Sequence, residues 1–319
     1  MSRPFTPRTR VSSYVSAWMP TGDETRQSVA GYFGGGYDTG SISGIDKIAF
    51  PADTKSTLSA TLSSARYSFA GMANSGVAGY FGGGYDTGSI SGIDKITFPA
   101  DTKTTLSATL SSGRSQLAGM ANSTVAGYFG GGNNGGYLSG IDKIAFPADT
   151  KSTLSATLST ARGFLAGMAN SGVAGYFGGG DDGGYVSGID KIAFPADTKS
   201  TLSATLTGAR YAPAGMADSG VAGYFGGGYQ PSYVSNIDKI TFPADTKSTL
   251  SATLTTARAY LAGMADTVVA GYFGGGQNSG GQISGIDKIA FPADTKTTLS
   301  ATLTTARTQL AAMADCGVF

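Results

Sequence analysis

Short stretches with strand-like alternation recur along this chain between glycine, proline and aspartate residues. In the segment 77–124, VAGYFGG (77–83) alternates small and aromatic residues, and IDKITF (93–98) alternates polar and apolar ones. TTLSATL (104–110) is rich in β-branched residues, and QLAGMAN (116–122) sets larger apolar side chains among small ones. Period-two alternation between turn residues is typical of β-strands, and no piece has a sustained helical period. The pattern therefore predicts four short strands and no helix.

These strands belong to a repeated unit. The motif GYFGGG begins at Gly31, Gly79, Gly127, Gly175, Gly223 and Gly271, and FPADTK begins at Phe50, Phe98, Phe146, Phe194, Phe242 and Phe291. The period is 48 residues throughout, apart from one extra residue in the loop after the last GYFGGG. A fixed period of this length with four strands per unit is typical of a β-propeller blade.

The number of strands of each type predicts how the ring closes. From residue 29 the chain supplies the second, third and fourth strands of a first blade, followed by five complete units. It ends with TQLAAMADCGVF (308–319), a sixth copy of the small-residue strand, which we place innermost because blades crowd together near the axis. We therefore predict an all-β, six-bladed propeller over residues 30–319, in which the C-terminal strand completes the first blade and removes the open edges.

Comparison of the six units with one another locates the variation in two places. One is the loop after GYFGGG, and the other is the triplet of residues after the arginine that follows the fourth strand. In an up-and-down blade both segments emerge at the same end of the ring, whereas the unvarying PADTK turns emerge at the other. Loops on a rigid scaffold commonly carry recognition. Neutral drift in the surface loops of duplicated units is the alternative.

The candidate ligand-binding residues are the aromatic, acidic and amide side chains of these varied segments. They are Tyr37, Asp38, Tyr85, Asp86, Asn133, Asn134, Tyr137, Asp181, Asp182, Tyr185, Tyr229, Gln230, Tyr233, Gln277, Asn278, Tyr67, Tyr211 and Tyr260. Such side chains supply stacking faces and adaptable hydrogen bonds, which suit a glycan or a protein surface.

Residues 1–29 lie outside the repeat and combine prolines with arginines, which predicts an extended, basic arm without a core of its own. Two interpretations stay open: a frayed terminus, or an anchoring arm that becomes ordered on another subunit. The anchoring residues of the second interpretation are Arg3, Phe5, Arg8, Arg10, Tyr14 and Trp18.

Composition narrows the range of functions. The 319 residues carry a net charge of +1, and 13 % of them are charged, so no strong field indicates nucleic acid or an acidic membrane. There is no histidine and a single cysteine, Cys316, which leaves no cysteine cluster or histidine ligand for a metal. The N-terminus lacks an apolar run of signal-peptide length, and no stretch matches a membrane span. We expect a soluble protein without cofactor or metal that is not exported by the usual secretory route.

The recurrent carboxylates have a structural interpretation and a catalytic one. Asp46 and Asp53 recur in all six units, and we expect them to form repeated hydrogen bonds and ion pairs with Lys47, Lys55 and Arg66.

Asp181 and Asp182 fall short of the oxygen ligands that calcium takes, so a turn is favoured there. The glycine runs lead into a strand and not into a helix, which argues against a phosphate site.

One further set of polar residues falls where each innermost strand turns into the next. It comprises Asn74, Asn122, Asn170, Asp218, Asp266 and Asp315. Capping of the turn is the simpler explanation, and a cation-attracting ring at the channel mouth is the alternative. Its three carboxylates also define the least favoured function, an enzyme acting on carbohydrate.

The order of strand motifs in each unit resembles the kelch repeat over residues 30–318. The double glycine (Gly34, Gly35) and an arginine after the outer strand (Arg66) match that family, whereas its usual tryptophan is replaced by leucine (Leu58). The resemblance implies the propeller fold but no particular chemistry. Near-identical units rich in glycine, serine and threonine also resemble bacteriophage virion proteins of tail fibres or baseplates. That resemblance implies a non-enzymatic attachment protein, assembled in the cytoplasm, whose arm binds other virion proteins and whose varied loops contact a host glycan or a neighbouring protein. A cellular kelch-like binding protein is the alternative.

Overall fold

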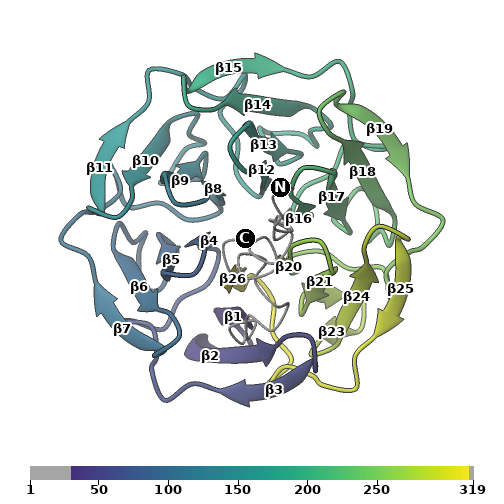
Figure 1. Ribbon diagram of the computed structural model, residues 1–319, viewed down its shortest axis with the longest axis horizontal. Helices are drawn as coiled ribbons and strands as arrows, with labels where there is room; N and C mark the ends of the chain where they lie inside the picture. Colours follow the sequence, from purple (N-terminus) through teal and green to yellow (C-terminus); the bar gives the residue numbers. More distant parts are fainter. Residues whose placement is uncertain (1–29, 316–319) are drawn as a thin grey trace, which may run out of the picture.

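The computed structural model describes residues 30–315, and these form a ring of six four-stranded antiparallel sheets around a central axis (Figure 1). The six-bladed propeller predicted from the repeat is thus confirmed. The predicted anchoring residues Arg3, Phe5, Arg8, Arg10, Tyr14 and Trp18 lie outside the described residues. No helix in the described part of the chain has the length and apolar character needed to span a membrane.

The strands of the six blades occupy equivalent positions. The innermost strands are β26 (Ala311–Asp315), β4 (Ala70–Asn74), β8 (Ala118–Asn122), β12 (Ala166–Asn170), β16 (Ala214–Asp218) and β20 (Ala262–Asp266) in blades 1 to 6. The second strands are β1 (Ala30–Tyr37), β5 (Ala78–Gly82), β9 (Ala126–Gly130), β13 (Ala174–Gly178), β17 (Ala222–Gly226) and β21 (Ala270–Gly274).

The outer half of each blade follows the same scheme. The third strands are β2 (Ser41–Ala49), β6 (Ile93–Thr97), β10 (Ile141–Ala145), β14 (Ile189–Ala193), β18 (Ile237–Thr241) and β24 (Ile286–Ala290). The outer strands are β3 (Thr54–Thr57), β7 (Thr102–Thr105), β11 (Thr150–Thr153), β15 (Thr198–Thr201), β19 (Thr246–Thr249) and β25 (Thr295–Thr298). The longer varied loop of blade 6 adds a ribbon of β22 (Gln277–Asn278) and β23 (Gly281–Gln282).

The C-terminal strand closes the ring, as the strand count predicted. Strand β26 pairs antiparallel with β1, and the register joins Ala30 to Asp315 and Gly34 to Ala311. The first blade is therefore built from both ends of the described chain, so every blade has its innermost strand and β1 is not left as a sheet edge.

The core lies between neighbouring blades. In the blade 2–blade 3 interface, Met72 and Tyr80 of one blade pack with Phe129 and Phe146 of the next. The rings of Tyr80 and Phe146 are stacked with their centroids 5.1 Å apart. The Tyr80 hydroxyl donates a hydrogen bond of 2.7 Å to Asp149, which sits in the PADTK turn of blade 3. Each blade is thus joined to the next by an apolar contact and a polar one.

Small residues allow the innermost strands to approach the axis. A Cβ atom on Gly119 of β8 would overlap the backbone carbonyl of Gly71 on β4. The same relation links Gly167, Gly215 and Gly263 to the strand before each of them. The placement of the small-residue strand at the centre, predicted from its composition, is confirmed.

The outer strand differs from the prediction. It was expected to span residues 104–110, but β7 covers Thr102–Thr105 and the chain then leaves the sheet edge. The Leu106 and Leu110 amides bond to carbonyls near the start of β6, each at 2.9 Å. Both leucines enter the core between blades 2 and 3, and an extended strand at the wet edge could not place them there.

The recurrent acids form the expected ion pairs, and one set is buried. Asp238 lies 2.9 Å from Arg210, and both side chains have no exposed surface. Asp294 instead lies in a partly exposed turn, 2.6 Å from Lys239 of the preceding blade. Exposed ion pairs contribute little to stability, but this does not hold for the buried aspartate–arginine pairs.

Candidate functional site

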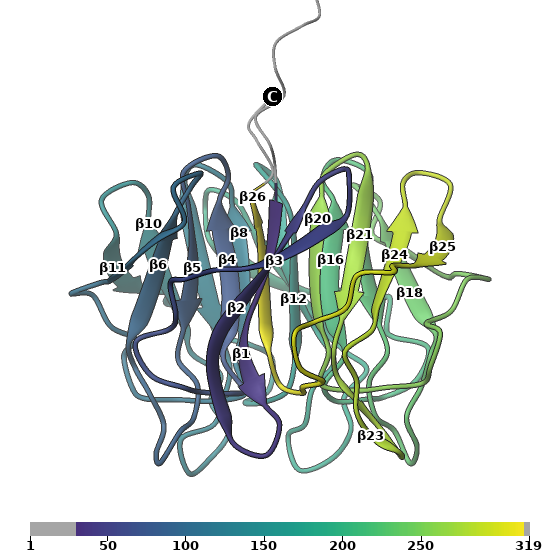
Figure 2. The ribbon, with the colours of Figure 1, turned by 90° about the horizontal axis from the view of Figure 1, so that it is seen from below.

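The two varied segments of each unit meet at one end of the ring, which we call the varied face. The first residue of the triplet forms a β-bridge with the first residue of the varied loop in every blade, as between Tyr67 and Tyr85 or Tyr211 and Tyr229. The turns that follow the innermost and third strands lie at the opposite end, the repetitive face (Figure 2). The arrangement predicted from strand order is confirmed, and it places every described candidate residue on one face.

The middle residues of the triplets form a closed ring of hydrogen bonds around the axis. The Ser68 amide donates to the Gln309 carbonyl at 2.8 Å, and each further middle residue donates to the middle residue of the preceding blade. These residues are Ser68, Gln116, Phe164, Ala212, Tyr260 and Gln309, and all six have φ between 52° and 61°. A left-handed backbone is costly for residues other than glycine, so the ring holds these side chains in one orientation despite that cost.

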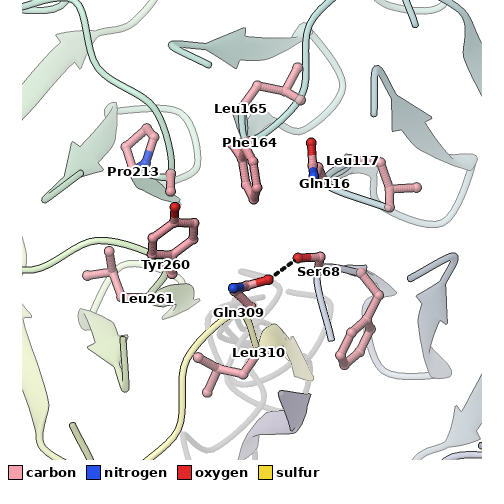
Figure 3. Close-up of a pocket in the computed structure, with 12 residues that line it drawn as sticks. Ser68, Gln116, Leu117, Phe164, Leu165, Pro213, Tyr260, Leu261, Gln309 and Leu310 are labelled. Atoms are coloured by element: carbon pink, nitrogen blue, oxygen red, sulfur yellow. Dashed lines mark hydrogen bonds between the residues drawn. The ribbon is translucent and has the colours of Figure 1, made fainter. Parts of the chain in front are cut away.

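The side chains of this ring surround a pocket of about 90 Å³ on the propeller axis (Figure 3). Phe164 and Tyr260 present aromatic faces to it, whereas Gln116, Gln309 and Ser68 present amide and hydroxyl groups. Ser68 and Gln309 are neighbours in the ring, and their side chains are also hydrogen-bonded to each other. The third residues of the triplets, such as Leu165, are buried behind them. The pocket therefore has aromatic and polar side chains around it and mostly apolar third triplet residues behind them.

Phe69 also lines the pocket but packs against the buried Phe81, whereas from Phe164 and Tyr260 aromatic rings continue outward over blades 4 to 6. They belong to Phe164, Tyr185, Tyr211, Tyr229, Tyr233 and Tyr260, which we call the aromatic track. The Tyr211 ring lies 5.7 Å from Tyr260 and 5.3 Å from Tyr229, centroid to centroid, so it links the pocket to the loop of blade 5. Burial, followed by a hydrogen bond with Tyr211, raises the pKa of Tyr260. Tyr260 therefore remains uncharged at neutral pH.

A groove continues the track between the loops of blades 5 and 6. It has a volume of about 560 Å³ and is lined by Tyr229, Ser232, Tyr233, Thr256, Ala257, Asn278 and Ser279. Pocket, track and groove thus form one line from the axis to the rim.

The other candidate residues fall outside this line. Tyr37, Tyr67 and Tyr85 form a separate aromatic group on blades 1 and 2. The Tyr67 ring centroid lies 5.2 Å from that of Tyr37 and 5.7 Å from that of Tyr85. Asp181 accepts a hydrogen bond of 2.8 Å from the Gly183 amide, which is the turn favoured over a calcium site. In the described residues no cluster of acids, cysteines or histidines is suited to a metal ion.

The remaining candidates are distributed over the rim. Burial, and then the charge of nearby Asp181, raises the pKa of Tyr137 on blade 3. Gln230 lies against Gly208, and Gln277 bridges to Ala259 in blade 6. The amides of Asp38, Asp86, Asn134 and Asp182 bond to the backbone of their own loops.

Among the residues that line the axial pocket, the sequence identified Tyr260 but neither the third residues of the triplets nor the other five middle residues: Ser68, Gln116, Phe164, Ala212 and Gln309. Variation marked their triplets, but nothing in the sequence shows which triplet residue faces the axis. That direction is set by the positive φ angles of the hydrogen-bonded ring.

Four polar residues at the opposite mouth link blades through their side chains and do not cap their own turns: Asn122, Asn170, Asp218 and Asp315. The Oδ1 atom of Asn74 is buried without a hydrogen-bond partner among the described residues. Asn170 accepts a hydrogen bond of 2.9 Å from the Gly220 amide, and Asp218 accepts one of 3.1 Å from the Val268 amide, in each case from the next blade. The prediction that each side chain caps its own turn is therefore wrong. The side chain instead caps the turn of the next blade, which lies beside the end of its strand. Asp218, Asp266 and Asp315 are all buried.

Asp218 offers a test of this link, because Asn170 makes the same bond without a charge. Burial raises the pKa of Asp218 above its ordinary value. Its carboxyl therefore contributes stability that is complete below its pKa in the unfolded chain and is lost as the pH rises through the higher folded pKa. We expect Asp218→Asn to raise the melting temperature at neutral pH by about 1–2 °C. Thermal melts should show the gain vanish near about pH 3, where the acid is neutral in both states. An equal gain at every pH would contradict this explanation.

No protein-family model matches the chain, and no curated protein matches it either.

Proposed function

We propose that this chain is a non-enzymatic, kelch-like propeller that serves as a structural or attachment protein of a virus particle, of the kind carried on bacteriophage tails. The observation that carries the proposal is the separation of the two ends of the ring. Ala30 and Asp315, the first and last described residues, pair at the repetitive face. All the varied segments lie at the other end. One end is thus suited to attachment and the other to recognition.

The repetitive face offers a contact surface for such attachment. A valine precedes the second strand in successive blades, and Val77, Val125, Val173 and Val221 are 40–47 % exposed. Val268 in blade 6 is 54 % exposed. Exposed apolar residues gathered at one end of a protein commonly mark a binding surface. We infer that residues 1–29 and this valine ring contact other virion proteins, first in the cytoplasm and then in the released particle.

The varied face would then point outward, towards a host glycan or a neighbouring protein. Its residues are held on a rigid ring, which suits recognition because little conformational entropy is lost on binding. The proposal requires no cofactor, metal, nucleic acid or membrane insertion.

Deletion of residues 1–29 tests the proposal in the source phage. We expect mass spectrometry of purified particles to find the full chain at fixed stoichiometry and the shortened chain at less than about a tenth of it, as loss of an anchoring contact implies. Circular dichroism and gel filtration of the shortened chain should show an intact monomeric ring. Full incorporation of the shortened chain would overturn the anchoring role. Recovery of the full chain only from the cell fraction would overturn the virion assignment in favour of a cellular binding protein.

A further inference from the structure

We propose that the varied face carries one binding site for a neutral oligosaccharide. The site runs from the axial pocket along the aromatic track into the groove of blades 5 and 6. This inference rests on the proposed recognition role of the varied face and names its ligand class and location. It is based on the asymmetry of a ring whose scaffold is nearly sixfold.

The first step is the continuity of aromatic surface. Phe164 and Tyr260 lie 5.4 Å apart at the axial pocket, and Tyr211 connects them to Tyr229. Tyr185, on the same line, is 43 % exposed. Aromatic faces that remain accessible bind the apolar faces of sugar rings, and tyrosine hydroxyls add hydrogen bonds at the edge. A row of such rings suits a chain of sugars better than a single one.

The second step is the polar lining at both ends of the track. Gln116, Gln309 and Ser68 supply amide and hydroxyl groups at the pocket, and the Oε1 atom of Gln116 is buried without a hydrogen-bond partner. Asn278 and Ser232 line the groove. These groups both donate and accept hydrogen bonds, which matches the hydroxyl and acetamido groups of sugars. The groove volume of about 560 Å³ lies within the range of small-molecule sites.

The third step is charge. None of the varied loops or triplets contains a lysine or arginine, so no basic side chain from them can pair with a sulfate, phosphate or sialic acid carboxylate. The charge of Asp181 acts on Tyr185 and Tyr260 of the track and would repel such anions. The site therefore selects uncharged sugars.

The fourth step is that only blades 4 to 6 carry the complete track and groove among the described residues. The position of Tyr229 is occupied by asparagine, aspartate or glutamine in three other blades (Asn133, Asp181, Gln277). Tyr37 and Tyr85 preserve the tyrosine, but their group is not connected to the Phe164–Tyr260 pair by any ring contact among the described residues. We therefore expect one oligosaccharide per chain, not six.

The repeat supplies matched variants for the test. Tyr229→Asn introduces the residue that blade 3 carries at the same position, and Tyr85→Asn makes the identical change in the separate aromatic group. Phe164→Gln likewise introduces the middle triplet residue of blade 3. Because sister blades fold with these residues, circular dichroism melts should show all three variants folded.

Binding would be measured by calorimetry of the full chain with neutral oligosaccharides of hexoses and N-acetylhexosamines, and with their sialylated and sulfated forms. We expect one site per chain, a loss of affinity of about tenfold for Tyr229→Asn and Phe164→Gln, and less than about a twofold change for Tyr85→Asn. Equal losses in all three variants, or preference for the charged sugars, would overturn the site.

Failure of this inference is distinguishable from failure of the proposed function. If no neutral oligosaccharide binds while the chain is found in particles, the glycan site is wrong and the varied face serves a protein partner. If an oligosaccharide binds with the expected variant pattern while the chain is absent from particles, the site stands and the virion assignment fails.

Discussion

Ending the chain after Arg307 is expected to prevent formation of the closed ring. The deleted residues include β26, which supplies the innermost strand of blade 1 through its pairing with β1. Leu310 and Met313 are both buried, and removing two such side chains from the core costs about 3–6 kcal/mol. That is a large part of the ~5–15 kcal/mol by which a domain is stable, before the exposed edge of β1 is considered. Gel filtration should find aggregate in place of monomer, and thermal melts should lose their cooperative transition.

A second truncation provides the control. Ending the chain after Asp315 keeps β26 and its register with β1, so we expect a monomer that melts within about 3 °C of the full chain. A monomeric, cooperatively melting chain that lacks residues 308–319 would show that closure by β26 does not stabilise the ring.

Replacing Asp238 with alanine is expected to reduce the free energy of unfolding by about 3–5 kcal/mol. Its carboxylate lies 2.9 Å from Arg210, and neither side chain is exposed, so the variant leaves an uncompensated charge in the core. The carboxylate also accepts a hydrogen bond of 2.8 Å from Thr249 of the outer strand and one of 2.9 Å from the Thr207 amide. Urea denaturation followed by circular dichroism would measure the loss.

Lys247→Ala is the matched control, because Lys247 lies 3.6 Å from the same carboxylate but is 26 % exposed. Exposed pairs contribute about 0–1 kcal/mol, so this variant should change stability little. Replacing both Arg210 and Asp238 with leucine should recover part of the stability, since no unpaired charge remains. Equal losses for Asp238→Ala and Lys247→Ala would contradict this account.

The same interaction predicts how the fold responds to acid. Burial acts to raise the pKa of Asp238, but hydrogen bonds from Thr207 and the charge of Arg210 outweigh it and lower the pKa. A carboxyl with a lowered folded pKa contributes stability above its unfolded pKa, and this is lost as the pH falls through the folded value. The difference in free energy of unfolding between the parent chain and Asp238→Ala should therefore become smaller as the pH falls through the folded pKa of Asp238.

The sequence predicted most of the scaffold because the scaffold repeats. A 48-residue period, four strand-like pieces and a sixth copy of the small-residue strand were sufficient to predict six blades and their closure. Prediction was wrong at the outer strand, where residues 106–110 have strand-like composition but leave the sheet edge. Their mixture of threonine, serine and leucine does not distinguish an edge strand from a segment that folds back to bury Leu110 and partly bury Leu106.

The site was predicted at lower detail. Comparison of the units located the varied face, and its tyrosines include five members of the axial pocket and aromatic track that remain exposed or partly exposed: Tyr185, Tyr211, Tyr229, Tyr233 and Tyr260. Tyr67 is the first residue of its triplet and Tyr260 is the middle residue of its own, but the units give no signal of which position faces the axis. The positive φ angle at the middle position turns Tyr260 to the axis, whereas Tyr67 bridges to Tyr85 of the varied loop.

The sequence by itself determined the number of blades, the strand order within each and the end of the ring at which variation lies. These properties follow from periodicity and chain direction, which are local and repeated six times. The tertiary structure alone decided that the aspartate–arginine pairs are buried, that four members of the Asn/Asp set join neighbouring blades, and that aromatic residues of blades 4 to 6 form one track from the axis. Each of these depends on contacts between units, and the sequence of a single repeat does not determine how one blade packs against the next.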